Sequence, residues 1–245
     1  MNIKNRLSEI ESTVQSGLDK EKTCDILELI HATSLFPKEL FDEFKLYDEY
    51  LPQIEVLPLT MEQKCLHLLW EIFEKLPLSL ITNFAVPFRR ILAKKLFKKC
   101  GKNFIVMEGV RFTFGHNIEV GDDVFINRDV FLDGKGGIIL GNFVALAENV
   151  EIYTHGHLEY NHNKRVYASV RVDDFAKVFS HAMLLPGIVV GEQAVVAANS
   201  VVTRSIDPNA FVVGIPARPT RERKSHGKIK RELGHIWLHN SAFQE

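Results

Sequence analysis

The segment "NVEIYTHGHLEYNHNKR", residues 149–165, brings three histidines together in a stretch that begins like a strand and ends like a loop. An imidazole, whose ordinary pKa is near 6.5, can take a proton from an attacking hydroxyl or bind a metal ion at neutral pH. A histidine that makes only ordinary hydrogen bonds in a core or on a surface is the alternative. The elements that position the segment decide between these roles.

The whole chain has the composition of an ordinary globular protein. It has 245 residues, of which 46% are hydrophobic and 25% charged, and a net charge of −1. This balance gives no attraction for nucleic acid, and no apolar run reaches the roughly 18 residues that cross a membrane. The start, "MNIKNRLSEIES", lacks the apolar region of a signal peptide, and Cys24, Cys65 and Cys100 are widely spaced. We therefore expect a cytoplasmic protein in a reducing compartment.

Residues 1–100 are predicted to be helical, because two stripes of apolar residues recur there at helical spacing. The stripes consist of Ile3, Leu7, Ile10, Val14 and Leu18, and of Met61, Cys65, Leu68, Leu69, Ile72, Phe73 and Leu76. Thr60 followed by Gln63 has the form of a capping box that opens the second helix. Prolines separate the segments, and we expect about four to six helices.

After Cys100 the period of the sequence becomes six. An aliphatic residue leads each of "VGDDVF", "INRDVF" and "LGNFVA", and from Val172 to Val202 the lead positions follow six apart without a slip. Three hexapeptides can close one triangular coil of short strands whose aliphatic residues stack inside. The repeat is two residues too long at "DGKGG", and again between Ile152 and Val172. The histidine-rich segment therefore opens an excursion from the coil.

Three motifs make residues 101–221 resemble the hexapeptide-repeat acyltransferases, close to the galactoside and maltose O-acetyltransferases and to polysaccharide O-acetyltransferases. They are "VGDDVFINRDVFLD", "NVEIYTHGH" and "LLPGIVVGEQAVVAANSVVTRSIDPNAFVVGIPAR". The resemblance implies a left-handed parallel β-helix over residues 101–217, after the helical region 1–100 and before a tail, 218–245, with a short helix at "ELGHIWLHNSAFQE". It also implies an acetyl-CoA-dependent O-acetyltransferase that modifies a sugar or surface-glycan precursor, as a homotrimer with active sites between subunits.

The same resemblance assigns roles to single residues. The family's catalytic histidine follows the pattern Tyr-Thr-x-x-His, which places His157 as the general base that deprotonates a sugar hydroxyl. Asn127 and Asp133 match the substrate-binding asparagine and aspartate, although side chains that only fill tight corners are the alternative. For His155 we expect a loop or packing role, because Gly156 interrupts the strand. No carboxylate is assigned to orient the base.

The acetyl-CoA site is expected toward the C-terminal end of the repeats. The residues that match cofactor-binding positions are Ser180, Ala198, Thr203, Arg204 and Arg218. Guanidinium groups suit the phosphates of the cofactor, and a solvated basic tail is the alternative. Lys177 and Phe179 stand where relatives have tryptophan and glycine, and Phe179 could narrow the acyl channel. No metal is expected.

Three other functions stay open at this point. An amino sugar or nucleotide-linked amino sugar as acceptor would make the protein an N-acetyltransferase. A zinc carbonic anhydrase shares the fold, and His157 and His162 have the offset of its paired ligands, with His116 as an available third histidine. A catalytically silent trimeric scaffold would use the helical region to bind a partner.

The segment "FRRILAKKLFKKCGK", residues 88–102, raises a separate possibility. Phe88, Ile91, Leu92 and Leu96 are apolar at helical spacing, and basic residues occupy most other positions. Such a helix can lie weakly on an anionic membrane surface. A helix that caps the open end of the solenoid, with its charges solvated, is the alternative.

Overall fold

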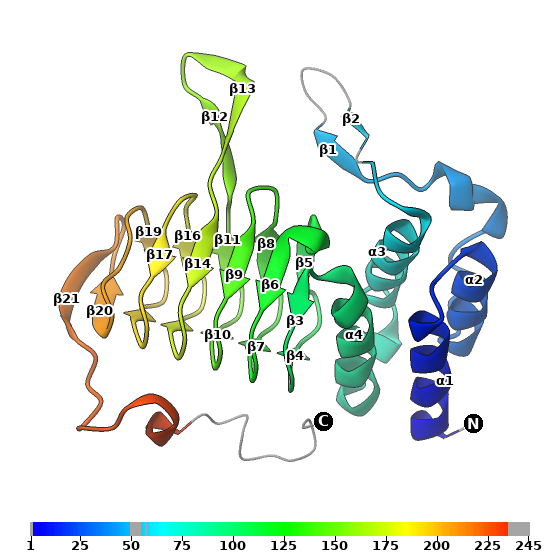
Figure 1. The fold of residues 1–245 in the computed structure, drawn as a ribbon, viewed down its shortest axis with the longest axis horizontal. Coiled ribbons are helices and arrows are strands. Elements are labelled where there is room, and N and C mark those ends of the chain that lie inside the picture. The colour runs from blue at the N-terminus through cyan, green and yellow to red at the C-terminus, as the bar shows by residue number, and fades with distance from the viewer. Residues whose placement is uncertain (1, 50–54, 57, 235–245) are drawn as a thin grey trace. The chain divides into compact units, whose positions relative to one another are not determined.

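Residues 2–49, 55–56 and 58–234 are described by the computed structural model, in which the chain divides into two units, Met1–Leu96 and Phe97–Glu245. The first unit is mainly helical, and the second is a parallel β-helix of short strands (Figure 1). The fold class predicted from the sequence, a parallel β-helix preceded by an α-helical region, is confirmed.

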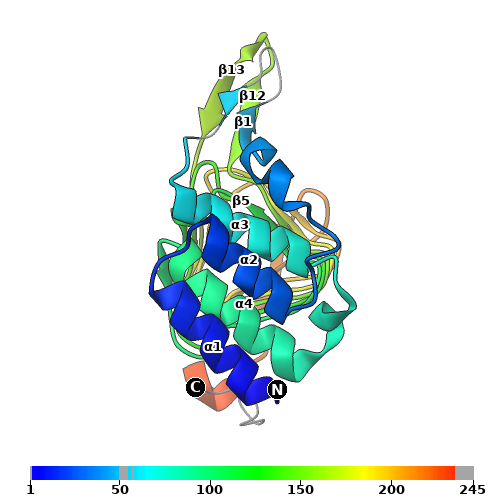
Figure 2. The ribbon, with the colours of Figure 1, turned by 90° about the vertical axis from the view of Figure 1, so that its right-hand side faces the viewer.

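The described residues of the N-terminal unit form four α-helices (Figure 2). Its elements are α1 (Ile3–Gln15), α2 (Lys20–Leu29), η1 (Lys38–Glu43), β1 (Tyr47–Glu49), β2 (Glu55–Val56), α3 (Met61–Phe73), η2 (Pro77–Leu80) and α4 (Thr82–Leu96). The predicted capping box opens α3, since the N–H of Gln63 donates to Oγ1 of Thr60 at 3.2 Å and the N–H of Thr60 donates to Oε1 of Gln63 at 2.9 Å.

Helix α4 holds most of the segment 88–102, for which a weak membrane-surface contact is a possibility. Phe88 is fully buried, and its ring lies 4.2 Å from that of Phe73 and 5.8 Å from that of Phe84. Arg89 is also buried, and its Nε donates to Oε1 of Glu74 at 2.6 Å. The aromatic core of the unit therefore takes up the apolar face of α4 on which such a contact would depend, whereas Lys94 and Lys95 stay exposed.

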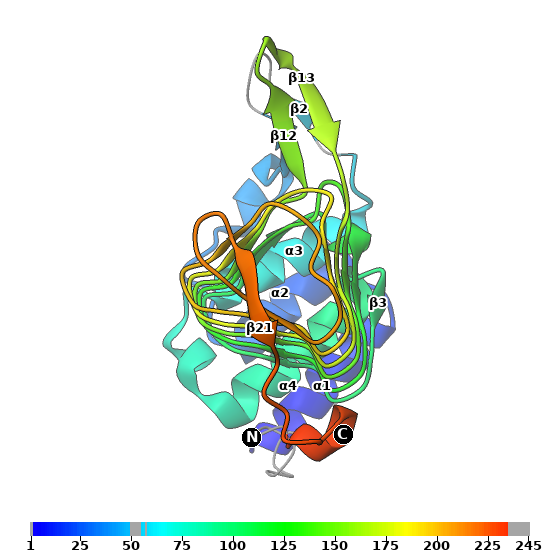
Figure 3. The same cartoon turned by 90° about the vertical axis from the view of Figure 1, so that its left-hand side faces the viewer.

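The β-helix consists of three parallel sheets that share its coils (Figure 3). The first contains β4 (Ile105–Val106), β7 (Phe125–Ile126), β10 (Ala145–Leu146), β15 (Lys177–Val178), β18 (Val195–Val196) and β20 (Ala210–Val213). The second contains β5 (Arg111–Thr113), β8 (Phe131–Asp133), β11 (Glu151–Ile152), β16 (Met183–Leu184) and β19 (Val201–Val202). The third contains β3 (Lys99–Cys100), β6 (Ile118–Val120), β9 (Ile138–Leu140), β14 (Val170–Val172) and β17 (Val189–Val190).

The aliphatic lead positions of the hexapeptides form the core of the β-helix. Val172, Leu184, Val190 and Val196 have no exposed surface, and Val202 is 1% exposed. Parallel pairing places each lead residue directly over the equivalent residue of the next coil, for example Leu146 over Val178. Each coil therefore covers the apolar side chains of its neighbour, as a solenoid requires.

The predicted excursion is an antiparallel hairpin of β12 (His155–Leu158) and β13 (Asn161–Tyr167), which projects from the coils (Figure 3). Because of it, β11 and β16 pair at an offset of 32 residues, from Glu151 to Met183, whereas β16 and β19 pair at an offset of 18, from Met183 to Val201. The coil register is regained as soon as the hairpin ends.

The C-terminal segment returns along the β-helix. Strand β21 (Arg218–Glu222) pairs antiparallel with β20, and η4 (Lys230–Leu233) follows. The Nη1 of Arg223 donates to the carbonyl oxygens of Phe175, at 3.2 Å, and Gln193, at 3.0 Å. The predicted helix at residues 232–245 falls largely in 235–245, outside the described residues.

Candidate active site

Thr154 fixes the point where the chain leaves the coil and enters the hairpin. It is fully buried, and its hydroxyl donates to the carbonyl oxygen of Asp133 and accepts from the N–H of Gly136, at 2.7 Å. Its own carbonyl oxygen accepts from the N–H of Ala168 at 2.9 Å, where the chain returns. Both ends of the hairpin are thus closed at one point, which sets the direction in which the two following histidines leave the coil.

Asp133, at the end of β8, is a buried carboxylate that accepts hydrogen bonds from several neighbouring groups. Its Oδ1 accepts from the hydroxyl of Thr113 at 3.0 Å, and its Oδ2 accepts from the N–H of Thr154 at 3.0 Å. Nδ1 of His155 lies 2.6 Å from the same Oδ2. Burial alone raises the pKa of Asp133, but hydrogen bonds from His155, Thr154 and Thr113, with the charge of His155, lower it to about 2. Asp133 is therefore ionised at neutral pH.

His155 lies over this carboxylate and faces the second histidine of the segment. Its side chain is 22% exposed, whereas that of Asp133 is 2% exposed. The ring centroids of His155 and His157 are 6.0 Å apart, and the ring of Tyr167 lies at 6.5 Å on β13. The loop or packing role that we predicted for His155 did not anticipate this contact with Asp133.

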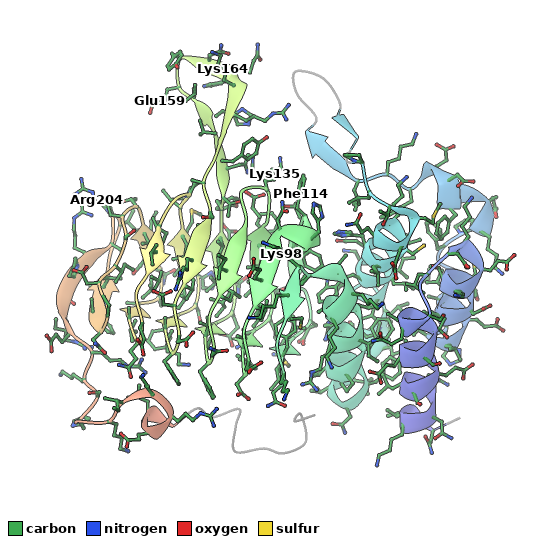
Figure 4. The ribbon with its side chains drawn as sticks, in the orientation of Figure 1. Lys98, Phe114, Lys135, Glu159, Lys164 and Arg204 are labelled. Atoms are coloured by element: carbon green, nitrogen blue, oxygen red, sulfur yellow. The ribbon has the colours of Figure 1, made fainter. Side chains whose placement is uncertain are left out.

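His157, the predicted general base, is exposed on β12, where it lies opposite Arg165 of β13. Its Nδ1 lies 2.5 Å from the backbone carbonyl oxygen of His162. A carbonyl oxygen can only accept, so Nδ1 carries the proton and Nε2 is the basic nitrogen of the neutral ring. Glu159 and Lys164 extend from the far end of the same hairpin (Figure 4).

A second polar cluster occupies another corner of the β-helix. The Nδ2 of Asn127 donates to Oε1 of Glu148 at 2.7 Å, and the hydroxyl of Ser180 donates to Oε2 of Glu148 at 3.0 Å. The N–H of Glu148 and the hydroxyl of Ser180 lower the pKa of Glu148. The carboxylate of Glu148 thus links Asn127, which is predicted to bind the sugar substrate, to Ser180, which is predicted to bind the cofactor.

The other predicted cofactor residues lie toward the C-terminal coils. Ala198 follows β18, Thr203 and Arg204 follow β19, and Arg218 begins β21; all four are exposed. Arg204 projects from this end of the β-helix (Figure 4). Exposed guanidinium groups beside backbone corners can bind phosphate groups.

Lys177 and Phe179 are the two residues that differ from those of the relatives. Lys177 begins β15, and Phe179 directly follows that strand. The Nζ of Lys177 donates to the carbonyl oxygen of Phe143 at 2.7 Å. Burial, together with the charge of Arg223, lowers the pKa of Lys177 to about 7. Phe179 is 46% exposed, so its ring is available to a bound molecule.

The structure brings Asp133, Thr154, His155 and His157 to one corner, and Asn127, Glu148 and Ser180 to another. Three of these residues, His155, Thr154 and Glu148, were not predicted as site residues. The double histidine of "YTHGH" was a signal for the first. No sequence motif marked Glu148, which lies at a corner of the β-helix one coil after Arg128.

The candidate zinc ligands do not come together. Among the residues that the structure describes, no three His, Cys, Asp or Glu side chains lie close enough to hold a metal ion. His157 and His162 meet through a backbone oxygen rather than through two ring nitrogens.

Within residues 2–49, 55–56 and 58–234, no helix is both long and apolar enough to span a bilayer.

Comparison with known proteins supports an acetyltransferase. No family model matches the chain. The galactoside O-acetyltransferase of Escherichia coli K12 is 30% identical over 144 residues, which are 57% of this chain and 71% of that protein. A putative acetyltransferase of Saccharomyces cerevisiae is 34% identical over 134 residues, which are 53% of this chain and 68% of that protein.

Solved structures agree with these relatives. A maltose O-acetyltransferase from Clostridium difficile 630 has a TM-score of 0.58 and 30% identity, covering 66% of this chain and 87% of that one. A hexapeptide-repeat acetyltransferase from Vibrio cholerae, solved with acetyl coenzyme A, has a TM-score of 0.55 and 29% identity, covering 60% and 84%. The chain therefore belongs to the hexapeptide-repeat acetyltransferases of the galactoside and maltose O-acetyltransferase type, and it is an acetyl-CoA-dependent acetyltransferase.

Proposed function

We propose that the protein transfers the acetyl group of acetyl-CoA to a hydroxyl of a sugar or surface-glycan precursor, with His157 as the general base. The observation that carries the proposal is the contact between Nδ1 of His157 and the carbonyl oxygen of His162 at 2.5 Å. This contact holds the ring in the tautomer whose Nε2 accepts a proton.

The reaction moves one proton and exchanges one bond. The acceptor oxygen attacks the thioester carbonyl while its proton passes to Nε2 of His157. The tetrahedral intermediate then collapses, the carbon–sulfur bond breaks, and the proton passes to the departing thiolate of coenzyme A. A correctly placed base contributes roughly 10²- to 10⁴-fold to such a step.

The acceptor class is supported by the relatives and by the polar corners. The relatives named above act on a galactoside and on maltose. Asn127 is proposed to hydrogen-bond to sugar hydroxyls through its amide group, and Asp133 is proposed to serve acceptor binding from its buried position. Ser180, Ala198, Thr203, Arg204 and Arg218 are proposed to bind acetyl-CoA.

A homotrimer would unite the two polar corners. Asn127 lies before β8 and Asp133 ends it, so one side of the coil separates them within a chain. If neighbouring chains pack with one corner of each facing the other, His157 of one chain and Asn127 of the next line the same site. This is the arrangement that the proposed trimer requires.

The test is thiol release from acetyl-CoA with methyl galactoside, maltose, nucleotide sugars and amino sugars, for wild type and His157→Ala. We expect release that depends on a sugar hydroxyl and falls at least about a hundredfold in the variant. His226→Ala, which removes an exposed imidazole of the C-terminal segment, is the matched control and should keep wild-type activity.

Two outcomes would change the proposal. Release only with amino sugars would make the protein an N-acetyltransferase. Unchanged release in His157→Ala would remove His157 as the base while leaving the acetyltransferase in place.

A further inference from the structure

The carboxylate predicted to bind acceptor is covered by a histidine. Asp133 is 1% exposed as a residue, and the side chain of His155, which lies over it, is 22% exposed. An acceptor that approaches this corner therefore meets the imidazole of His155 before it meets the carboxylate.

The oxygens of Asp133 are also occupied by the protein. Oδ1 accepts from the hydroxyl of Thr113, and Oδ2 accepts from the N–H of Thr154 and from Nδ1 of His155, at 3.0, 3.0 and 2.6 Å. A sugar hydroxyl would have to displace one of these buried donors and leave it unpaired, which is costly. The hydrogen bonds of Asp133 therefore go to protein groups rather than to a ligand.

We propose that His155 is a second catalytic residue that contacts the acceptor through Nε2, and that Asp133 is a positioning residue that acts only through His155. This inference rests on the proposed function, since it concerns the acceptor of that same site.

The chemistry of the pair gives His155 its role. Oδ2 of Asp133 accepts a hydrogen bond from the Nδ1–H group of His155, so the lone pair of the neutral ring lies on Nε2. That nitrogen accepts a hydrogen bond from a second hydroxyl of the acceptor while His157, with its ring 6.0 Å away, takes the proton of the attacking hydroxyl. The acceptor class that fits two imidazoles at this spacing is a sugar with two neighbouring hydroxyls.

The test is a double-mutant cycle on Asp133→Asn and His155→Ala, with the best acceptor of the glycoside panel. We expect each single variant to lower kcat/KM for the acceptor about tenfold, the cost of one hydrogen bond to the acceptor, mainly through KM. The KM for acetyl-CoA should not change. The double variant should be no worse than His155→Ala, because Asp133 has no role without the imidazole.

Additive losses in the cycle would show that Asp133 contacts the acceptor itself and would overturn the inference. A fall of kcat in His155→Ala equal to that of His157→Ala, with KM unchanged, would also overturn it, because His155 would then be the base. Absence of thiol release from wild type with every acceptor would instead count against the proposed function.

A second measurement does not depend on activity. In ¹H–¹⁵N spectra of the imidazoles, the proton on Nδ1 of His155 should be observed in wild type and lost in Asp133→Asn. Asp207→Asn, an exposed aspartate of another coil, is the matched control and should leave both the spectrum and the kinetics unchanged. Persistence of the Nδ1 proton in Asp133→Asn would contradict the positioning role.

Discussion

The amino group of Lys177 is buried where its charge is unfavourable. Its Nζ donates to the carbonyl oxygen of Phe143, and Arg223 places a second positive charge nearby. Burial, and then the charge of Arg223, lower the pKa of Lys177 from 10.5 to about 7. The folded protein thus releases this proton at a lower pH than the unfolded chain does.

This pKa predicts that the free energy of unfolding rises with pH from about 7 to about 10.5. In that range the unfolded chain binds a proton that the folded protein lacks, so a higher pH favours the folded state. Below about pH 7 both states are protonated, and the cost of the buried charge is constant. Lys177→Met should remove this contribution to the slope.

The measurement is urea unfolding at several pH values from 6.5 to 9.5, for wild type, Lys177→Met and Lys164→Met. Lys164 is exposed on the hairpin, so its replacement should keep the wild-type slope. An identical slope in all three proteins would mean that Lys177 keeps its proton when folded.

At the scale of the element, the corners of the coils are joined by side chains that cap backbone groups of the preceding coil. Oδ1 of Asp122 accepts from the N–H of Lys102, Oδ1 of Asn142 from the N–H of Asp122, and Oδ1 of Asp174 from the N–H of Asn142. These bonds run at 2.7 to 2.8 Å along one corner. Glycines directly precede Lys102, Asp122 and Asn142, because the coils approach closely there.

Gly141→Ala should destabilise the β-helix. A Cβ atom at this position would lie 2.8 Å from the backbone nitrogen of Asp174, which cannot move without shifting a coil. We expect a loss of about 1 to 3 kcal/mol in the free energy of unfolding, measured in urea, as for other overpacked sites. Gly156→Ala is the control, since its nearest neighbour would be Cγ2 of Val166 at 3.9 Å. Equal stability of the two variants would contradict the close approach of the coils.

The coil itself could be predicted from the sequence because one short-range rule generates it. Val172, Val190 and Val202 recur at multiples of six, and a period of six with buried aliphatic residues determines both the strands and the stacking. The two breaks in the period also marked where the chain leaves this pattern.

The contact of Asp133 with His155 could not be predicted in the same way. The two residues are 22 positions apart, and their meeting depends on how the hairpin leaves the coil at Thr154. The polar strand β13 has no hydrophobic alternation, so periodicity gave no register for it. The predicted roles of Asn127, Asp133 and His157 came from motif resemblance and stay predictions.

At the scale of the whole molecule, the proposed trimer predicts that two inactive chains can restore each other. His157→Ala and Asn127→Ala each remove one half of a site that adjoining chains would form. Mixed trimers should contain sites with both residues intact. After unfolding and refolding an equal mixture, random assembly should return about a quarter of wild-type activity.

The separate variants, refolded alone, are the controls and should stay inactive. Light scattering should give the mass of a trimer for each protein, since neither substitution alters a buried apolar residue. A trimer whose mixture stays inactive would place both residues of each site in one chain.

The closure of the hairpin at its base has an evolutionary consequence. The chain leaves at Thr154 and returns at Ala168 through one 2.9 Å hydrogen bond, and the strands on either side stay in register. Mutations between these two points, including insertions and deletions, are therefore separated from the packing of the coils. Acceptor preference can therefore diverge among such proteins through changes in this hairpin that leave the packing of the coils intact.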